Sequence, residues 1–213
     1  MKVLVTGADG FVGEHLVAEL LANGYDVAGS TLNLPPVRDT LTPAEASSID
    51  WKAADIRDHD ALVRLISAVR PEQIFHLAGF ASGALARENA ALSLNVNAGG
   101  TVNLFEAVMS VRDDSPEFDP RILVMGSGDS YGDAARDAVP LSEDMPLRPV
   151  SPYGLSKAAQ ELAAHTYRRA HGMRILVLRS FNLVGTGQRA GFFFPSLVAR
   201  IVRAMRAGRS GII

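Results

Sequence analysis

The stretch KVLVTGADGFVG, residues 2–13, decides the fold. Its first five residues form a short apolar run that predicts a buried strand. Glycines follow at positions 7, 10 and 13, and an apolar pattern at helical spacing continues to Ala22. Glycine permits a sharp turn and a close approach of the backbone to a diphosphate. The stretch therefore predicts a nucleotide-binding strand–turn–helix, with a plain glycine-rich turn as the alternative.

Short apolar runs alternate with longer helical patterns along the rest of the chain. We expect further strands over 26–30, 49–53, 73–77, 121–125 and 174–178, and helices over 11–22, 58–69, 89–110, 151–170 and 195–207. This alternation predicts a doubly wound parallel sheet, a Rossmann-like α/β fold. We expect a dinucleotide-binding domain over 1–179 and the beginning of a substrate-binding region over 180–213. The apolar ending SGII, residues 210–213, suggests that the carboxyl-terminal substrate lobe is largely missing.

Composition excludes several classes of protein. The chain has 213 residues, a formal net charge of −2 and 47% hydrophobic residues, which is ordinary for a globular protein and excludes disorder. Cysteine is absent, so disulfides and thiolate metal sites are excluded, and the five histidines show no metal-ligand spacing. No apolar run reaches the roughly 20 residues that span a bilayer, and no signal peptide precedes Asp9. We expect a soluble cytoplasmic protein without a metal or a membrane partner.

Charge is distributed unevenly. All 23 acidic residues lie at or before Glu161, whereas residues 162–213 hold nine arginines and no acid. Either this basic part packs against acidic partners in the fold, or it serves an anionic ligand such as a nucleotide diphosphate, for which Arg189 is the candidate contact. The pI of 6.2 and the lack of a basic run interleaved with aromatics argue against nucleic acid.

Two further motifs carry candidate chemistry. Tyr153 and Lys157 stand four apart on a predicted helix and project from one face, so the ammonium is expected to lower the pKa of the phenol and make it a general acid or base. Lys157 can also bind the nicotinamide ribose; a surface pair is the alternative. Ser127, in MGSGDSYG (125–132), follows a strand and is placed to hold a substrate carbonyl oxygen. Asp129 is a candidate acid or base, or a turn former.

The form of the nicotinamide cofactor depends on the end of the strand 26–30. An acid there normally binds the ribose 2′-hydroxyl of NAD. Here Ser30, Thr31 and Asn33 occupy those places and Arg38 is the nearest arginine, which favours NADP(H) and leaves NAD(H) open. Asp55 and Ile56 follow the strand 49–53 and are placed at the adenine edge. The alternative for Asp55 is the capping of the next helix.

These motifs, with HLAG (76–79), NAGGTVNLFEA (97–107) and RSFNLVGTGQ (179–188), resemble the extended short-chain dehydrogenase/reductase, or epimerase/dehydratase, family. The resemblance implies that Ser127, Tyr153 and Lys157 are catalytic and that Asn97 is structural. The expected cofactor-binding residues are Gly7, Asp9, Gly10, Phe11, Val12, Asp55, Ile56, Leu77, Ala78, Gly79, Tyr153 and Lys157. The expected substrate-binding residues are Ser127, Asp129, Asn182 and Arg189.

Within the family, GSGDSYG, LRPVSPYGLSKAAQE and FNLVGTGQ are most similar to GDP-4-dehydro-6-deoxy-D-mannose reductases. That similarity implies NAD(P)H-dependent reduction of a nucleotide-linked 4-keto-6-deoxyhexose. Gly128, where dTDP-glucose dehydratases carry an acid, and Ser180, where proline is usual, are departures. Asp129 favours the alternative of a 4,6-dehydratase or 4-epimerase with retained cofactor; a non-catalytic nucleotide-binding module is the other alternative. The helices 89–110 and 151–170 are expected to pair in a homodimer.

Overall fold

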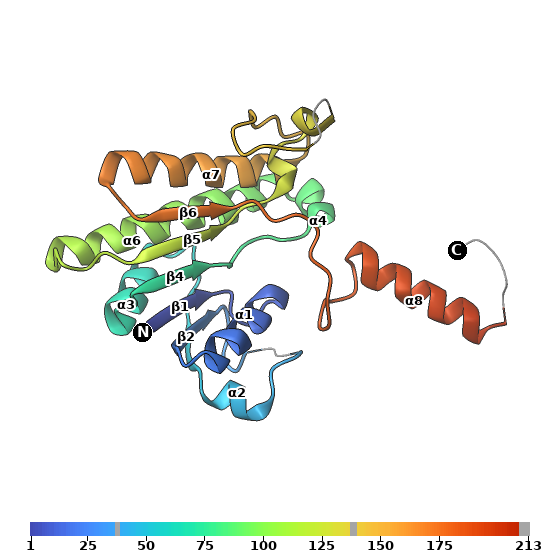
Figure 1. Cartoon of the computed structure of the whole chain (residues 1–213), viewed down its shortest axis with the longest axis horizontal. Coiled ribbons are helices and arrows are strands. Elements are labelled where there is room, and N and C mark those ends of the chain that lie inside the picture. The colour runs from blue at the N-terminus through green and yellow to red at the C-terminus, as the bar shows by residue number, and fades with distance from the viewer. Residues whose placement is uncertain (37–38, 137–139, 209–213) are drawn as a thin grey trace. The chain divides into compact units, whose positions relative to one another are not determined.

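A six-stranded parallel sheet forms the centre of the protein in the computed structural model, which describes residues 1–36, 39–136 and 140–208 (Figure 1). The strands are β1 (Lys2–Thr6), β2 (Asp26–Thr31), β3 (Asp50–Ala53), β4 (Gln73–His76), β5 (Arg121–Met125) and β6 (Ile175–Leu178). Their order, β3-β2-β1-β4-β5-β6, reverses between β1 and β4. In open parallel sheets ligands bind at such a reversal, beyond the carboxyl ends of the strands. The predicted Rossmann-like fold is confirmed.

Helices pack on both faces of the sheet through two separate apolar clusters. One cluster joins α3 (His59–Val69), α6 (Gly100–Asp114) and α7 (Pro152–His171) to strands including β4 and β5. The other joins α1 (Phe11–Ala22) to β1 and β2 through Val3, Val5 and Val17. Each face of β1 is therefore buried, as a central parallel strand requires.

Local signals set where these helices begin and end. Asp58 accepts a 3.0 Å hydrogen bond from the backbone N–H of Ala61 at the start of α3. Ser151 does the same for Gly154 at the start of α7, where Pro152 occupies the first turn. Gly172, with φ of 63°, ends α7 in the left-handed conformation that favours glycine. Capping of this kind supplies partners for backbone groups that a helix leaves without intrahelical bonds.

Two segments differ from the sequence prediction. The helix expected over 89–110 is present as an unbroken helical stretch made of α5 (Ala90–Leu94), a π turn (Asn95–Gly99) and α6, and it is preceded by a helix that was not predicted, α4 (Gly83–Glu88). The backbone of Asn89, at φ −133° and ψ 61°, separates α4 from α5. The expected loop between β2 and β3 contains α2 (Pro43–Ser47), which begins with a capping box between Thr42 and Glu45.

The chain divides into two compact units, Met1–Phe181 and Asn182–Ile213. The second unit contains α8 (Phe193–Arg206), a helix expected over 195–207. The functions assigned above to residues 1–179 and 180–213 stay predictions, and the SGII ending lies outside the described residues. Within the part of the chain that the structure describes, no helix has both the length and the apolar character needed to cross a bilayer.

Candidate active site

The turn between β1 and α1 is built for a close-lying ligand. Gly7 has φ of 69°, and a Cβ atom there would lie 2.8 Å from the backbone of Ala78. A Cβ on Gly13 would lie 2.2 Å from the carbonyl oxygen of Gly7, so both positions require glycine. No side chain among the described residues caps the start of α1 at Gly10. A bare helix N-terminus behind a glycine turn is a site that fits a diphosphate.

Most of the residues predicted to bind the cofactor follow the carboxyl ends of β1, β4 and β3, and the other two, Tyr153 and Lys157, lie on α7. Gly7, Asp9 and Gly10 follow β1, Leu77 follows β4, and Asp55 follows β3. Phe11 and Val12 open α1, Ala78 and Gly79 continue from Leu77, and Ile56 continues from Asp55. The ends of β1 and β4 flank the reversal of the sheet order, whereas β3 lies beyond β2, two strands from β1. The contact of these residues with a cofactor stays a prediction.

Asp55 has a partner within its own turn. Its carboxylate accepts hydrogen bonds from the Arg57 guanidinium, with Nη2 at 2.6 Å, and this pairing holds the pKa of Asp55 below its ordinary value. The helix that follows is capped by Asp58 and not by Asp55. Ile56 is buried and packs against Gly100, where a Cβ atom would lie 2.6 Å from the isoleucine side chain.

Ser127 and Tyr153 come together from two elements. Ser127 follows β5, is 8% exposed and accepts a 3.2 Å hydrogen bond from the backbone N–H of Asp129. Tyr153 lies in the first turn of α7, close enough to the Ser127 side chain for that hydroxyl to lower its pKa. A hydroxyl beside a phenol can hold a carbonyl oxygen while the phenol exchanges a proton with it.

The pKa of Tyr153 corrects one sequence expectation. Burial raises the pKa of the phenol above its ordinary value, the Ser127 side chain lowers it, and the negative charge of Asp129 raises it, for a net increase. The expectation that Lys157 lowers this pKa is therefore wrong. The reason lies in the direction of the ammonium, which donates to the carbonyl of Met125 at 2.9 Å and to Gln160 Oε1 at 2.9 Å.

Lys157 is buried at the start of a chain of polar side chains that the sequence analysis missed. Gln160 Nε2 donates to Thr101 Oγ1 at 2.7 Å, and Thr101 Oγ1 lies 3.0 Å from His76 Nε2. His76 Nδ1 lies 2.8 Å from Thr6 Oγ1 on β1. Each of these side chains is at most 6% exposed. Their hydrogen bonds link α7 to β1 at the centre of the sheet.

Burial dominates the ionisation of this network. It lowers the pKa of Lys157 to about 8. Burial, followed by the positive charge of Lys157, lowers the pKa of His76 to about 3, so this histidine is neutral at pH 7. The available sequence signal was polar residues at core-facing positions, such as Gln160 three residues after Lys157.

Asn97, in the π turn, forms hydrogen bonds with α7 and with the segment after β4. Its Nδ2 donates to Ser156 Oγ at 2.8 Å, and its Oδ1 accepts from the backbone N–H of Phe80 at 2.7 Å. A Cβ atom on Gly79 would lie 2.8 Å from this Oδ1, so glycine is needed there. Asn97 thereby connects α7 with the chain that follows β4, which agrees with the structural role that the resemblance implies.

The other predicted substrate residues lie apart from this cluster in the chain. Asn182 and Arg189 belong to the second unit and are exposed within the structure, and their contact with a substrate stays a prediction. Among the described residues, no group of three or more histidine, aspartate or glutamate side chains is arranged to hold a metal ion.

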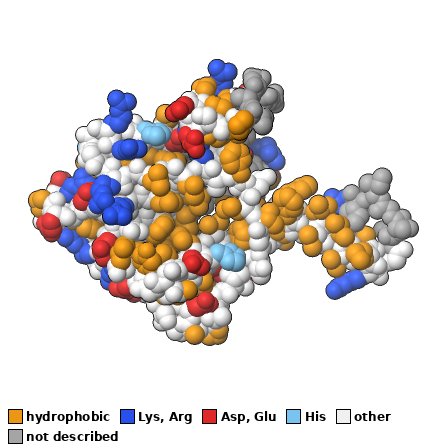
Figure 2. All heavy atoms as spheres, viewed as in Figure 1, with side chains coloured by type: hydrophobic (Ala, Val, Ile, Leu, Met, Phe, Trp, Pro, Cys, Tyr) orange, Lys and Arg blue, Asp and Glu red, His pale blue; other side chains and the backbone are white. Residues whose placement is uncertain are grey.

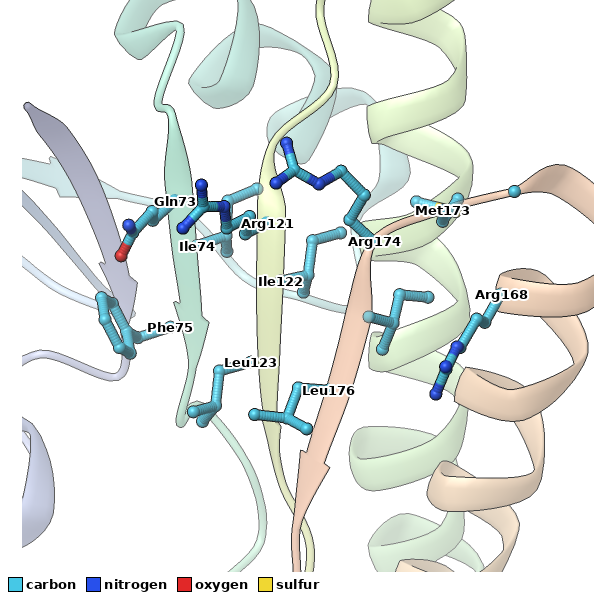
Figure 3. A pocket seen from close by; sticks show the side chains of 12 residues that line it. Gln73, Ile74, Phe75, Arg121, Ile122, Leu123, Arg168, Met173, Arg174 and Leu176 are labelled. Carbon is cyan, nitrogen blue, oxygen red and sulfur yellow. The ribbon is translucent and has the colours of Figure 1, made fainter.

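A hollow on the first unit lies on one face of the sheet, towards the amino ends of its strands. It runs along β4, β5 and β6 and is lined by Gln73, Arg121 and Arg174 near the starts of these strands, with Phe75, Leu123 and Leu176 further along (Figure 3). Hydrophobic side chains gather on this side of the molecule, where Leu176 is 62% exposed (Figure 2). Ser127 follows the end of β5, so the hollow is separate from the Ser127–Tyr153 pair.

Comparison with known proteins gives consistent matches along the chain. The model of the NAD dependent epimerase/dehydratase family matches residues 3–213. The UDP-glucose 4-epimerase of Mycolicibacterium smegmatis is 36% identical over 218 residues, covering 99% of this chain. The GDP-6-deoxy-D-mannose reductase of Pseudomonas aeruginosa is 31% identical over 211 residues, covering 98%. This chain spans 64% and 62% of the lengths of these two relatives.

A solved structure shows the same fold. The UDP-glucose 4-epimerase of Thermus thermophilus, in complex with NAD, matches with a TM-score of 0.79 and 30% identity, covering 99% of this chain and 64% of that one.

Proposed function

Because this chain belongs to the NAD dependent epimerase/dehydratase family, we propose that it catalyses oxidoreduction at C4 of a nucleotide-linked hexose with a nicotinamide cofactor, NAD(H) or NADP(H). The observation that carries this proposal is that the Ser127 side chain lies close enough to Tyr153 to influence its pKa, with Lys157 one helical turn further along α7. A non-catalytic nucleotide-binding module would not need this combination of side chains.

The chemistry of the site follows from the protonation of its own residues. The bound cofactor supplies or accepts a hydride. Tyr153, with a raised pKa, is a neutral phenol at pH 7 and can donate its proton to an oxygen that becomes an alkoxide. The Ser127 hydroxyl donates a hydrogen bond to the same oxygen and holds it beside Tyr153. Lys157, whose ammonium donates to the carbonyl of Met125 and to Gln160, binds the nicotinamide ribose in this proposal and leaves the phenol's charge unbalanced.

The specific substrate we propose is GDP-4-dehydro-6-deoxy-D-mannose, reduced at C4 to the GDP-deoxyhexose. A neutral phenol is the form that protonates a reduced carbonyl, which supports the reductive direction. The GDP-6-deoxy-D-mannose reductase of P. aeruginosa, at 31% identity, supports the nucleotide sugar. In this function Asn182 and Arg189 contact the substrate, Arg189 at the diphosphate.

A 4-epimerase or 4,6-dehydratase that retains its cofactor is the second candidate. The 36% identity to the M. smegmatis UDP-glucose 4-epimerase favours it. Asp129 favours it as well, because its charge acts on Tyr153 and a carboxylate there can serve as a base. The two candidates differ in whether added NADH or NADPH is consumed.

The experiment measures oxidation of NADH and NADPH with enzymatically prepared GDP-4-keto-6-deoxymannose, beside a titration of each cofactor. Net oxidation is expected, and Tyr153→Phe is expected to abolish turnover while cofactor binding persists. Tyr25→Phe, just before β2, is the matched control. Turnover by Tyr153→Phe equal to the wild type would refute the mechanism. Cofactor binding without oxidation, with UDP-glucose converted to UDP-galactose, would favour the epimerase.

We also propose that the protein forms a homodimer through α5 and α7. Leu155 and Leu162 on α7 are 53% and 61% exposed, and Leu92 on α5 is 39% exposed. A helix face of exposed leucines is typical of a subunit interface. Light scattering should give a dimeric mass for the wild type and a monomeric mass for Leu162→Glu; a monomeric wild type would refute the proposal.

A further inference from the structure

The carboxyl end of β2 carries a carboxylate that comes from another part of the chain. Residues 27–36, VAGSTLNLPP, contain no charged side chain. Asp9, in the glycine turn after β1, accepts a hydrogen bond from the hydroxyl of Thr31, the last residue of β2. An acid at this strand end is the group that binds the adenine-ribose 2′-hydroxyl in NAD-dependent folds of this kind.

The position of Asp9 is set by the backbone around it. The N–H groups of Gly7 and Ala8 both donate to the carbonyl of Ser30, at 2.9 and 3.2 Å. The carbonyl of Thr31 accepts from the N–H of Ala54 at 2.9 Å, which fixes the end of β2 against the chain that follows β3. Thr31 is only 4% exposed, so its hydroxyl has little freedom to turn away from Asp9.

One oxygen of Asp9 remains available for a ligand. Thr31 donates to Oδ2, while Oδ1 accepts no hydrogen bond from any residue that the structure describes. The cations on β3 and in the turn that follows it have partners of their own: Lys52 pairs with Asp50 at 2.7 Å and Arg57 pairs with Asp55 at 2.6 Å. A 2′-phosphate would therefore meet negative charge here, with neither of these cations placed to balance it.

We propose that Asp9 selects the cofactor, by accepting a hydrogen bond from the 2′-hydroxyl of NAD(H) and repelling the 2′-phosphate of NADP(H). This inference rests on the proposed function, because it concerns the same cofactor site. It reverses the preference for NADP(H) that the absence of an acid in β2 suggested, since the acid comes from the glycine turn. Arg38, the basic residue considered above, lies outside the described residues and enters the test as a variant.

The test compares affinities without relying on turnover. Dissociation constants for NADH and NADPH come from nicotinamide fluorescence, and those for 5′-ADP and 2′,5′-ADP from calorimetry, which isolates the adenine half. We expect the wild type to bind NADH and 5′-ADP at least about tenfold more tightly than their 2′-phosphorylated counterparts. Asp9→Asn, which removes the charge and keeps an acceptor for Thr31, should reduce that ratio about tenfold. Arg38→Ala should leave the preference for NADH in place.

Asp26→Asn is the matched control, because it removes the same charge from the amino end of β2, where the side chain is 65% exposed. Its binding ratio should equal that of the wild type. A wild-type preference for NADPH, or an unchanged ratio in Asp9→Asn with circular dichroism like that of the wild type, would overturn the inference and leave the proposed function standing. Failure of the wild type to bind either dinucleotide would refute the proposed function, and the inference with it.

Discussion

Lys157 Nζ donates a 2.9 Å hydrogen bond to Gln160 Oε1, and Gln160 Nε2 in turn donates to Thr101 at 2.7 Å. Gln160 is 1% exposed, so it supplies one of the few acceptors that a buried ammonium can reach. Gln160→Leu should therefore lower the pKa of Lys157 below its value of about 8 and reduce the free energy of unfolding by about 2 kcal/mol. NMR titration of the lysine side chain and urea unfolding measure the two effects.

Gln160→Glu is the companion variant to Gln160→Leu. It keeps an acceptor for Lys157 and adds a negative charge, so the pKa of Lys157 should rise instead of fall. If both substitutions leave the Lys157 titration where it is in the wild type, the hydrogen bond does not influence the ammonium.

His76 makes stability depend on pH. Its pKa is about 3 in the folded protein, against 6.5 for an ordinary histidine, so between these values the unfolded chain binds more protons. The free energy of unfolding should rise with pH across that window, by at most about 1.4 kcal/mol per pH unit, and fall as the solution is acidified below pH 6.5. Urea unfolding between pH 5 and 6.5 avoids most carboxyl titration.

His76→Gln should flatten this slope, whereas His59→Gln, at an exposed position, should leave it unchanged. Direct NMR titration of the His76 ring covers the case in which the first variant does not fold. Protonation of that ring at pH 6 in the folded protein would contradict the prediction.

Arg179 joins α7 to the segment that carries Ser127. It pairs with the buried carboxylate of Glu161 and donates to Tyr131 Oη at 2.8 Å. Burial raises the pKa of Glu161, but the hydrogen bonds and charge of Arg179 outweigh it, and the pKa is lowered overall. Arg179→Met should cost about 3 kcal/mol in urea unfolding, because Glu161 is then buried without its cation.

The control for Arg179→Met is Arg174→Met. Arg174 immediately precedes β6, and Arg179 immediately follows it. Arg174 is 48% exposed and lies 4.0 Å from Asp119, so its loss should cost under about 1 kcal/mol. Glu161→Gln combined with Arg179→Met should recover part of the lost stability. If Arg174→Met and Arg179→Met lost the same free energy of unfolding, the buried Arg179–Glu161 pair would stabilise the protein no more than an exposed ion pair does.

The sequence predicts what local patterns determine. The bounds of β1 and α1 were predicted residue by residue because an apolar run meets glycines at one end and Asn23–Gly24 at the other. The π turn around Asn97 was not, because its hydrogen bond to Ser156 spans 59 positions of sequence. The hydrogen bond between Thr31 and Asp9 was not predicted for the same reason, because it links two segments that only the sheet brings together.

In the candidate site, residue identity was easier to predict than ionisation. The pairing of Ser127 with Tyr153 follows from the strand and helix that carry them. The pKa of Tyr153 does not, because it depends on burial and on where the Lys157 ammonium points, and helical spacing alone suggested the opposite sign.

Gly13 tests the glycine turn directly. A Cβ atom there would lie 2.2 Å from the carbonyl oxygen of Gly7 and 2.8 Å from the backbone of Ala8, and backbone cannot move aside as a flexible side chain can. Gly13→Ala should therefore cost about 2 kcal/mol or more in urea unfolding and weaken NADH binding at least about tenfold. Gly83→Ala is the control, because a Cβ atom there meets open space at the start of α4 and should leave both quantities nearly unchanged. Normal NADH affinity in a folded Gly13→Ala protein would mean that the dinucleotide does not depend on the tight turn between β1 and α1.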